Sequence, residues 1–218
     1  MVLLALLALT ASEPTTITLN PTADVWAYGH ASDPTKDPFL RVWGDGEVAL
    51  APTLGEVESF SYSYLKFEWK AAPAGKLESA ELVVQNVANP PFDVEASKAA
   101  PLQARPWRSD WQEKGFDYGY TTKNGPTMKD KGLYGEGSAT EITPEKPVVI
   151  RINLLAKDSP FAADFAAAPK VMSMVLTSKM SPQEGGARTV YKLFSNDNGK
   201  DELRPKLILK FAAASNRR

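Results

Sequence analysis

The end of the chain constrains the fold most, because a loop and a proline lead directly into strict alternation. Pro205 is followed by the segment 206–211, Lys-Leu-Ile-Leu-Lys-Phe, in which every second residue is apolar and lies on one face. Proline lacks an amide hydrogen and therefore suits the first position of a strand. Lys206 and Lys210 place charge on the opposite face. The segment predicts the closing strand of a β-sandwich.

Alternating segments of this kind recur along the chain with turn residues between them. One helix is also indicated, over 159–168, where Ser159 can cap and Pro160 suits the first helical position. The pattern predicts an all-β fold, an antiparallel two-sheet β-sandwich with one short helix. We expect strands at 16–19, 24–28, 39–43, 63–69, 77–84, 148–154, 171–177, 189–194 and 206–211.

The alternation fails over about 86–146, which contains Pro90-Pro91 and a glycine-rich stretch from Gly132 to Gly137. We expect a long decorated loop region there, with one or two short strands. Loops of such length are usually functional or disordered. The chain is thus expected to form one sandwich domain over 12–211 with a loop insertion, followed by a disordered tail over 212–218.

Composition excludes several function classes. The 25 basic and 26 acidic residues give a net charge of −1, so nucleic acid is not an expected partner. The absence of cysteine excludes disulfides and thiolate chemistry. His30 is the single histidine, which excludes a metal site built from two or three histidines. Any Ser–His–Asp triad would have to use His30 as its histidine. We therefore predict no catalytic residues.

The first residues resemble a secretory leader. The apolar run 2–9 is followed by the small residues Thr10, Ala11 and Ser12, as near a signal-peptidase site. The run is too short to span a bilayer, which needs about 20 apolar residues, and no other segment reaches that length. We expect residues 1–11 to be removed and the protein to be secreted or held at the cell surface. A disordered apolar N-terminus is the alternative.

Aromatic and basic residues suggest a ligand surface. In the expected strands 24–28 and 39–43, we assign Val25, Ala27, Leu40 and Val42 to the core face. The alternate residues of the two strands, together with Lys36 of the loop between them, then form an outward strip of Trp26, Tyr28, Lys36, Arg41 and Trp43. Aromatic faces stack on sugar rings, and cations bind hydroxyls or uronate carboxylates. A shift of one residue in the strand phase would instead bury the tryptophans.

A second aromatic cluster, around Trp107 and Trp111, could line a groove or pin its loop to the sandwich. We include both tryptophans as candidate ligand-binding residues and expect the structural role to dominate.

Oxygen-bearing side chains in or beside turns suggest a structural calcium ion. Ca²⁺ takes six to eight oxygen ligands, although turn capping by Asp and Asn is the commoner use of such residues. The candidate ligands are Asp24, Asp45, Asn196, Asp197 and Asp201.

A series of short motifs resembles the DNRLRE-type modules, also called family 96 carbohydrate-binding modules and related to disaggregatase repeats, over residues 16–211. The resemblance implies a jelly-roll-like sandwich on secreted or surface proteins, non-catalytic, with some members binding acidic polysaccharides. The chain departs from the family in its longer 85–146 region and in the segment 195–200. The motifs, in order, are Asp24-Val25-Trp26, Leu40-Arg41-Val42-Trp43-Gly44, Tyr64-Leu65-Lys66-Phe67-Glu68, Leu77-Glu78-Ser79-Ala80-Glu81-Leu82, Trp107 and Trp111 with Glu113, Val149-Ile150-Arg151-Ile152, and Arg204-Pro205-Lys206-Leu207.

Three functions follow as hypotheses. The first is a secreted, non-catalytic module that binds a polysaccharide, which is expected to be acidic if Lys36 and Arg41 take part. The second is a structural or adhesive cell-surface domain, which buried tryptophans would favour. The third is a polysaccharide lyase or hydrolase, which would need Tyr118 or Tyr120 to meet a basic residue in a cleft.

Overall fold

The structure is a computed structural model that describes residues 13–28, 34–44, 60–71, 74–88, 92–124, 132–140, 142–180 and 191–213. The expected leader, His30, Asp45 and residues 214–218 of the expected tail lie outside the described residues.

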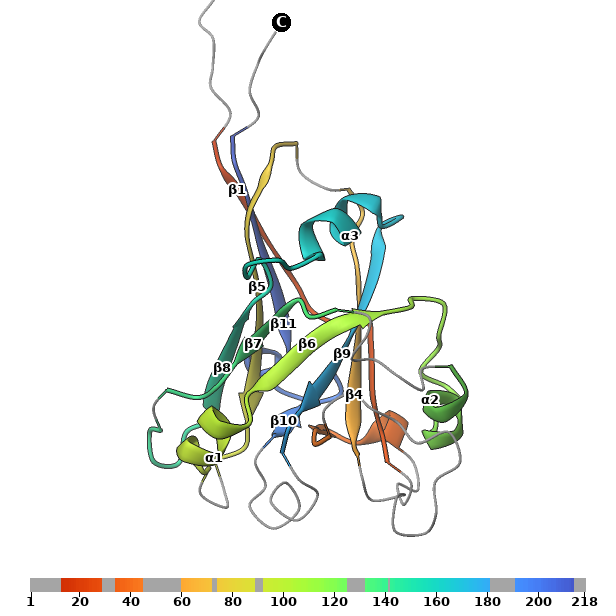
Figure 1. The fold of residues 1–218 in the computed structure, drawn as a ribbon, viewed down its shortest axis with the longest axis vertical. Helices are drawn as coiled ribbons and strands as arrows, with labels where there is room; N and C mark the ends of the chain where they lie inside the picture. Colours follow the sequence, from red (N-terminus) through yellow and green to blue (C-terminus); the bar gives the residue numbers. More distant parts are fainter. Residues whose placement is uncertain are drawn as a thin grey trace, which may run out of the picture.

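Two antiparallel sheets form the molecule, as the alternation predicts (Figure 1). In the first sheet the strand order is β1-β11-β5-β10-β3, and β8 pairs with β5. In the second sheet the order is β2-β4-β9-β6-β7. The first sheet comprises β1 (Thr15–Leu19), β3 (Phe39–Arg41), β5 (Leu77–Asn86), β8 (Val148–Asn153), β10 (Lys192–Phe194) and β11 (Lys206–Phe211). The second comprises β2 (Ala23–Ala27), β4 (Tyr62–Glu68), β6 (Leu102–Trp107), β7 (Gly135–Gly137) and β9 (Val171–Ser178). The all-β sandwich is confirmed.

The described residues form three α-helices rather than the single one expected: α1 (Val94–Ala99), α2 (Tyr118–Asn124) and α3 (Phe161–Ala167). Helix α3 is the expected helix, but its N-cap is Pro160 and not Ser159, so it begins one residue later than expected. The Ser159 Oγ still accepts the Phe161 N–H at 3.2 Å. Helix α1 is capped by Asp93, whose carboxylate accepts the Ala96 N–H at 2.9 Å. Helices this short leave little helical periodicity in a sequence, which is why α1 and α2 were missed.

The region 86–146 is less of a loop than its composition suggests. It supplies the two short strands β6 and β7, and β6 lies inside the second sheet between β9 and β7. Leu102 and Ala104 of β6 face the core, while Gln103 and Arg105 are buried on the opposite face of the sheet. A strand buried on both faces does not show the polar and apolar alternation that marks a half-exposed strand.

The second sheet is covered on both faces. Its inner face packs against the first sheet in the main core, which includes Trp26, Leu65 and Met174. Its outer face carries a second apolar cluster of Val25, Ala27, Phe60, Tyr62, Tyr64, Trp107, Trp111, Phe116 and Val175. The segment 107–118 begins at Trp107, the last residue of β6, and its Trp111 and Phe116 cover this face.

The two sheets meet at one edge, where β7 lies against β8. A Cβ added at Gly135 would lie 2.0 Å from the Asn153 carbonyl oxygen, and one at Gly137 would lie 2.3 Å from that of Arg151. Real Cβ atoms do not approach a backbone oxygen so closely, so glycine is needed at both positions. The glycine-rich stretch is therefore a close packing contact.

Candidate functional site

The expected outward strip is only partly exposed. Trp26 and Trp43 are each 8% exposed and belong to the main core, so the predicted exposure of both indole rings is wrong. In β2 the phase is reversed, because Val25 and Ala27 face the outer cluster and Trp26 faces the other sheet. Trp43 is drawn inward because the chain leaves β3 after Arg41, and its backbone N–H donates to the Ser61 carbonyl at 2.9 Å.

Four members of the strip nevertheless gather in space. The rings of Trp26 and Tyr28 stack with centroids 6.0 Å apart, and Tyr28 meets Trp43 edge-on at 5.2 Å. The Arg41 guanidinium carbon lies 5.6 Å from the centroid of the Trp26 ring, within cation–π range. Lys36 is exposed at the end of the short 3₁₀ helix η1 (Pro34–Lys36).

Trp107 and Trp111 have the structural role that was expected. They are 6% and 1% exposed, respectively. The Trp111 Nε1–H donates to Ser173 Oγ of β9 at 3.1 Å, and the Lys66 ammonium lies 4.7 Å from the centroid of the Trp111 ring. The Lys66 ammonium also donates to the Trp111 carbonyl oxygen. These contacts hold the segment 107–118 against the second sheet.

The outer face of the β3 and β10 pair carries a group that we call the cationic surface: Phe39, Arg41, Lys192 and Phe194. Lys192 lies directly opposite Arg41, and Phe194 opposite Phe39, while Leu40 and Leu193 between them face the core. The Phe39 and Phe194 rings are 5.5 Å apart, and the Lys192 ammonium lies 4.3 Å from the Phe39 centroid. All four side chains are half-buried, so each keeps some solvent access.

Electrostatics at the cationic surface favour an anion. Burial and then the charge of Arg41 lower the pKa of Lys192, and the carboxylate of Asp37 opposes this shift. Two cations held opposite one another repel, so a bound anion would stabilise both. Of these residues, only Arg41 was predicted as a site residue. Phe39 lies two residues before Arg41 in β3, so alternation places both side chains on the same face. Lys192 comes beside Arg41 only through the pairing of β10 with β3, a long-range contact that the sequence pattern does not predict.

A cluster of three carboxylates lies at another place in the fold. Each of three residues contributes one carboxylate oxygen, and these oxygens lie within 4.8 Å of one another. The residues are Asp24 of β2, Glu113 of the segment 107–118 and Asp197 of the loop after β10. Asp24 is 2% exposed, and one of its oxygens accepts the Asn196 N–H at 2.6 Å. Two of the predicted metal ligands, Asp24 and Asp197, are therefore brought together. Glu113 was missed because its distance along the chain gives no sign of the contact.

Burial changes the protonation of this acidic cluster. It raises the pKa of Asp24 to about 7, with the charges of Asp197 and Glu113 adding to the rise and the Asn196 N–H opposing it. Burial, and then the charge of Asp197, raise the pKa of Glu113 to about 7. The pKa of Asp197 is also raised by burial, against the charge of Arg204. A divalent cation would relieve the same cost by offsetting two of the three negative charges.

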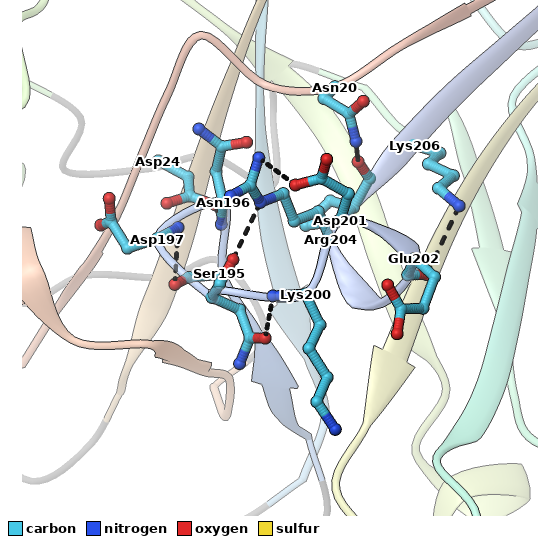
Figure 2. A network of polar contacts seen from close by, with 12 residues as sticks. Asn20, Asp24, Ser195, Asn196, Asp197, Lys200, Asp201, Glu202, Arg204 and Lys206 are labelled. Atoms are coloured by element: carbon cyan, nitrogen blue, oxygen red, sulfur yellow. Dashed lines mark hydrogen bonds and ion pairs between the residues drawn. The ribbon is translucent and has the colours of Figure 1, made fainter.

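Two further predicted ligands lie among the described residues. Asn196 donates its backbone N–H to Asp24, and Asp201 has a different role from metal binding. It forms an ion pair with Arg204 at 2.7 Å, and the Arg204 Nε–H donates to the Asn198 carbonyl at 2.9 Å (Figure 2). The Asn198 side chain accepts the Lys200 N–H at 3.0 Å, as the turn-capping alternative predicts. These bonds fix the loop that carries Asp197 and Asn196 to Asp24.

The tyrosines required by the enzyme hypothesis pack against apolar rings. Tyr118 stacks on Phe60 with ring centroids 5.0 Å apart, and the ring centroids of Tyr120 and Phe116 are 4.5 Å apart.

None of the described helices is long and apolar enough to cross a membrane. No family model and no curated protein matches the chain. The resemblance to the DNRLRE-type modules accordingly stays a prediction.

Proposed function

We propose that this chain is a secreted, non-catalytic β-sandwich module that binds an acidic polysaccharide through its cationic surface. The observation that carries the proposal is the direct cross-strand pairing of Arg41 with Lys192 beside the half-buried Phe39 and Phe194 rings. Cations bind carboxylates by charge-assisted hydrogen bonds, and the ring faces supply apolar contact to the sugar.

The expected affinity is low because the surface is small. One or two charge-assisted contacts and a stacked ring correspond to about 4 to 6 kcal/mol, or dissociation constants from millimolar to tens of micromolar. Exposed charge interactions are screened by salt, so binding should weaken as ionic strength rises.

Affinity electrophoresis in gels that contain alginate, pectin or neutral glucan tests the proposal. Arg41→Ala and Lys192→Gln should each reduce the retardation by the acidic polymers measurably. Lys157→Gln, which removes one positive charge from an exposed turn elsewhere, is the matched control and should migrate like the parent. The proposed surface is wrong if an acidic polymer retards the parent and both site variants equally.

A structural or adhesive domain without a glycan site is the second candidate. It is favoured by the burial of all four tryptophans in the two predicted aromatic groups, which are 8% exposed or less. Aromatic stacking by tryptophan, the usual device for neutral sugars, is thus not offered by these four rings. If no polymer in the electrophoresis series retards the parent protein, this second function replaces the first.

We also propose the acidic cluster as the site of a structural calcium ion. Asp24, Glu113 and Asp197 supply three hard oxygen donors, and Ca²⁺ prefers such ligands and completes its six to eight positions with carbonyls or water. The ion would join β2, the segment 107–118 and the loop after β10. Its effect would be on stability and not on the polymer contact itself.

A further inference from the structure

A groove of about 600 Å³ lies at the far end of the second sheet from the cationic surface. Sites for small ligands typically occupy about 300 to 1,000 Å³, so one or two sugar units suit its size. Ser109, Pro169 and Val171 also line an adjoining hollow of about 270 Å³, which extends the groove beneath the end of α3. The groove is lined by Lys66, Glu68, Trp69, Lys70, Ser109, Pro169, Lys170 and Val171.

The groove lining carries two exposed lysines, Lys70 and Lys170, and one carboxylate, that of Glu68. The third lysine, Lys66, directs its ammonium to Trp111, and Asp164 lines the adjoining hollow. Lys70 and Lys170 are exposed, and neither forms an ion pair with any residue that the structure describes. Exposed lysine ammonium groups that line a groove and form no ion pair attract anions and concentrate them there.

Lys170 is held in a conformation that lysine rarely adopts. Its φ of 72° lies in the left-handed region, where glycine or asparagine is the usual residue. The backbone fixes it there: the Lys170 N–H donates to the Ala168 carbonyl at 2.9 Å, and the Lys170 carbonyl accepts the Trp69 N–H at 3.0 Å. Glycine would adopt this backbone at lower cost, so Lys170 can be replaced by glycine without disturbing the turn.

The groove and the cationic surface lie apart. Ser63 Oγ donates to the Arg41 carbonyl at 3.0 Å at one end of β4, and Lys70 follows the other end of the same strand. Seven residues separate Ser63 from Lys70, which corresponds to about 20 Å along a strand. In Figure 1, α3 at the groove end and β10 at the cationic surface accordingly lie toward opposite ends of the molecule.

We infer that the lysine groove is a second binding site, for a carboxylate- or sulfate-bearing sugar unit, and that one molecule bridges two segments of an acidic polymer. The ligand class rests on the proposed function, whereas the site rests on the groove and its exposed lysines. The ammonium groups of Lys70 and Lys170 bind the anionic group, and the Ser109 hydroxyl lies in the same lining for a sugar hydroxyl.

The decisive variant is Lys170→Gly. Glycine accepts the left-handed backbone, so the variant should unfold at the same temperature as the parent or higher, while the lysine side chain with its ammonium group is lost. Lys70→Gln removes the second ammonium. Each should weaken binding of alginate or dextran sulfate about tenfold once the cationic surface is disabled by Arg41→Ala and Lys192→Gln. Alginate presents carboxylates and dextran sulfate presents sulfates, so the two polymers distinguish the anion, and neutral dextran is the control polymer.

Bridging is measured by light scattering of protein mixed with alginate at low salt. The parent should form large particles, whereas the groove variants and the cationic-surface variants should each bind the polymer without enlarging it. If the groove variants bind and bridge like the parent, the second site is refuted while the proposed function stands. If the Arg41 and Lys192 variants match the parent and the groove variants lose all binding, the proposed surface is wrong, and the groove is a single site that cannot bridge.

Discussion

Replacing Asp24 with asparagine tests whether burial controls the acidic cluster. Asparagine has the same shape, and its side-chain oxygen can still accept the Asn196 N–H that Asp24 accepts at 2.6 Å. Only the charge is removed. The pKa of Asp24 is about 7 in the folded protein against 3.8 in the reference state, so the folded state binds this proton more tightly than the unfolded state.

The sign of the pH effect follows from that difference. Below about pH 4 the carboxyl is protonated in both states, and the unfolding free energy has its full value. As the pH rises from about 4 to 7, the unfolded chain ionises first, so stability falls. A shift of about three pKa units corresponds to an upper limit of about 4 kcal/mol, because one unit is worth about 1.36 kcal/mol. Domains are stable by only about 5–15 kcal/mol, so the loss is measurable.

Urea unfolding between pH 5 and pH 8, in the presence of a chelator, is the assay. Of the upper limit of about 4 kcal/mol, about 2 to 3 kcal/mol falls between pH 5 and pH 8. The parent should lose up to this amount through Asp24, and Asp24→Asn should lose correspondingly less and be the more stable protein at pH 8. Glu113, whose pKa burial also raises to about 7, is present in both proteins, so the difference between the two curves reports on Asp24. Parallel curves would show that Asp24 ionises normally and would refute the desolvation argument.

Three further outcomes are expected. At pH 8, added Ca²⁺ should raise the melting temperature of the parent but not of Asp24→Asn; equal responses would exclude the acidic cluster as the calcium site. Gly137→Ala should cost about 2 kcal/mol or more, because its Cβ would lie 2.3 Å from the Arg151 oxygen, and Gly119→Ala, with its nearest contact at 3.3 Å from a side chain, is the tolerated control. Mature protein from its natural source should begin near Ser12 by mass spectrometry, and an intact Met1 on cytosolic material would contradict the predicted export.

The strands could be predicted because their signal is local. All the expected strands are present, including β11, where alternation over Lys206–Phe211 sets the face of every residue. Orientation failed in β2, since Val25 and Trp26 are both buried and apolar and alternation cannot say which faces the other sheet. That choice is made by the segment 107–118, which covers the outer face of the second sheet from about eighty residues away along the chain.

The same segment explains why the candidate sites were only partly foreseen. It brings Glu113 to Asp24, places Ser109 in the lysine groove and is held by the contact of Trp111 with Lys66. Each contact joins residues far apart in sequence, so no spacing rule could reveal them. The segment thus covers one sheet face and contributes a residue to each of two proposed sites. Loss of its anchor should therefore disturb both the acidic cluster and the groove, and leave the cationic surface on the other sheet intact.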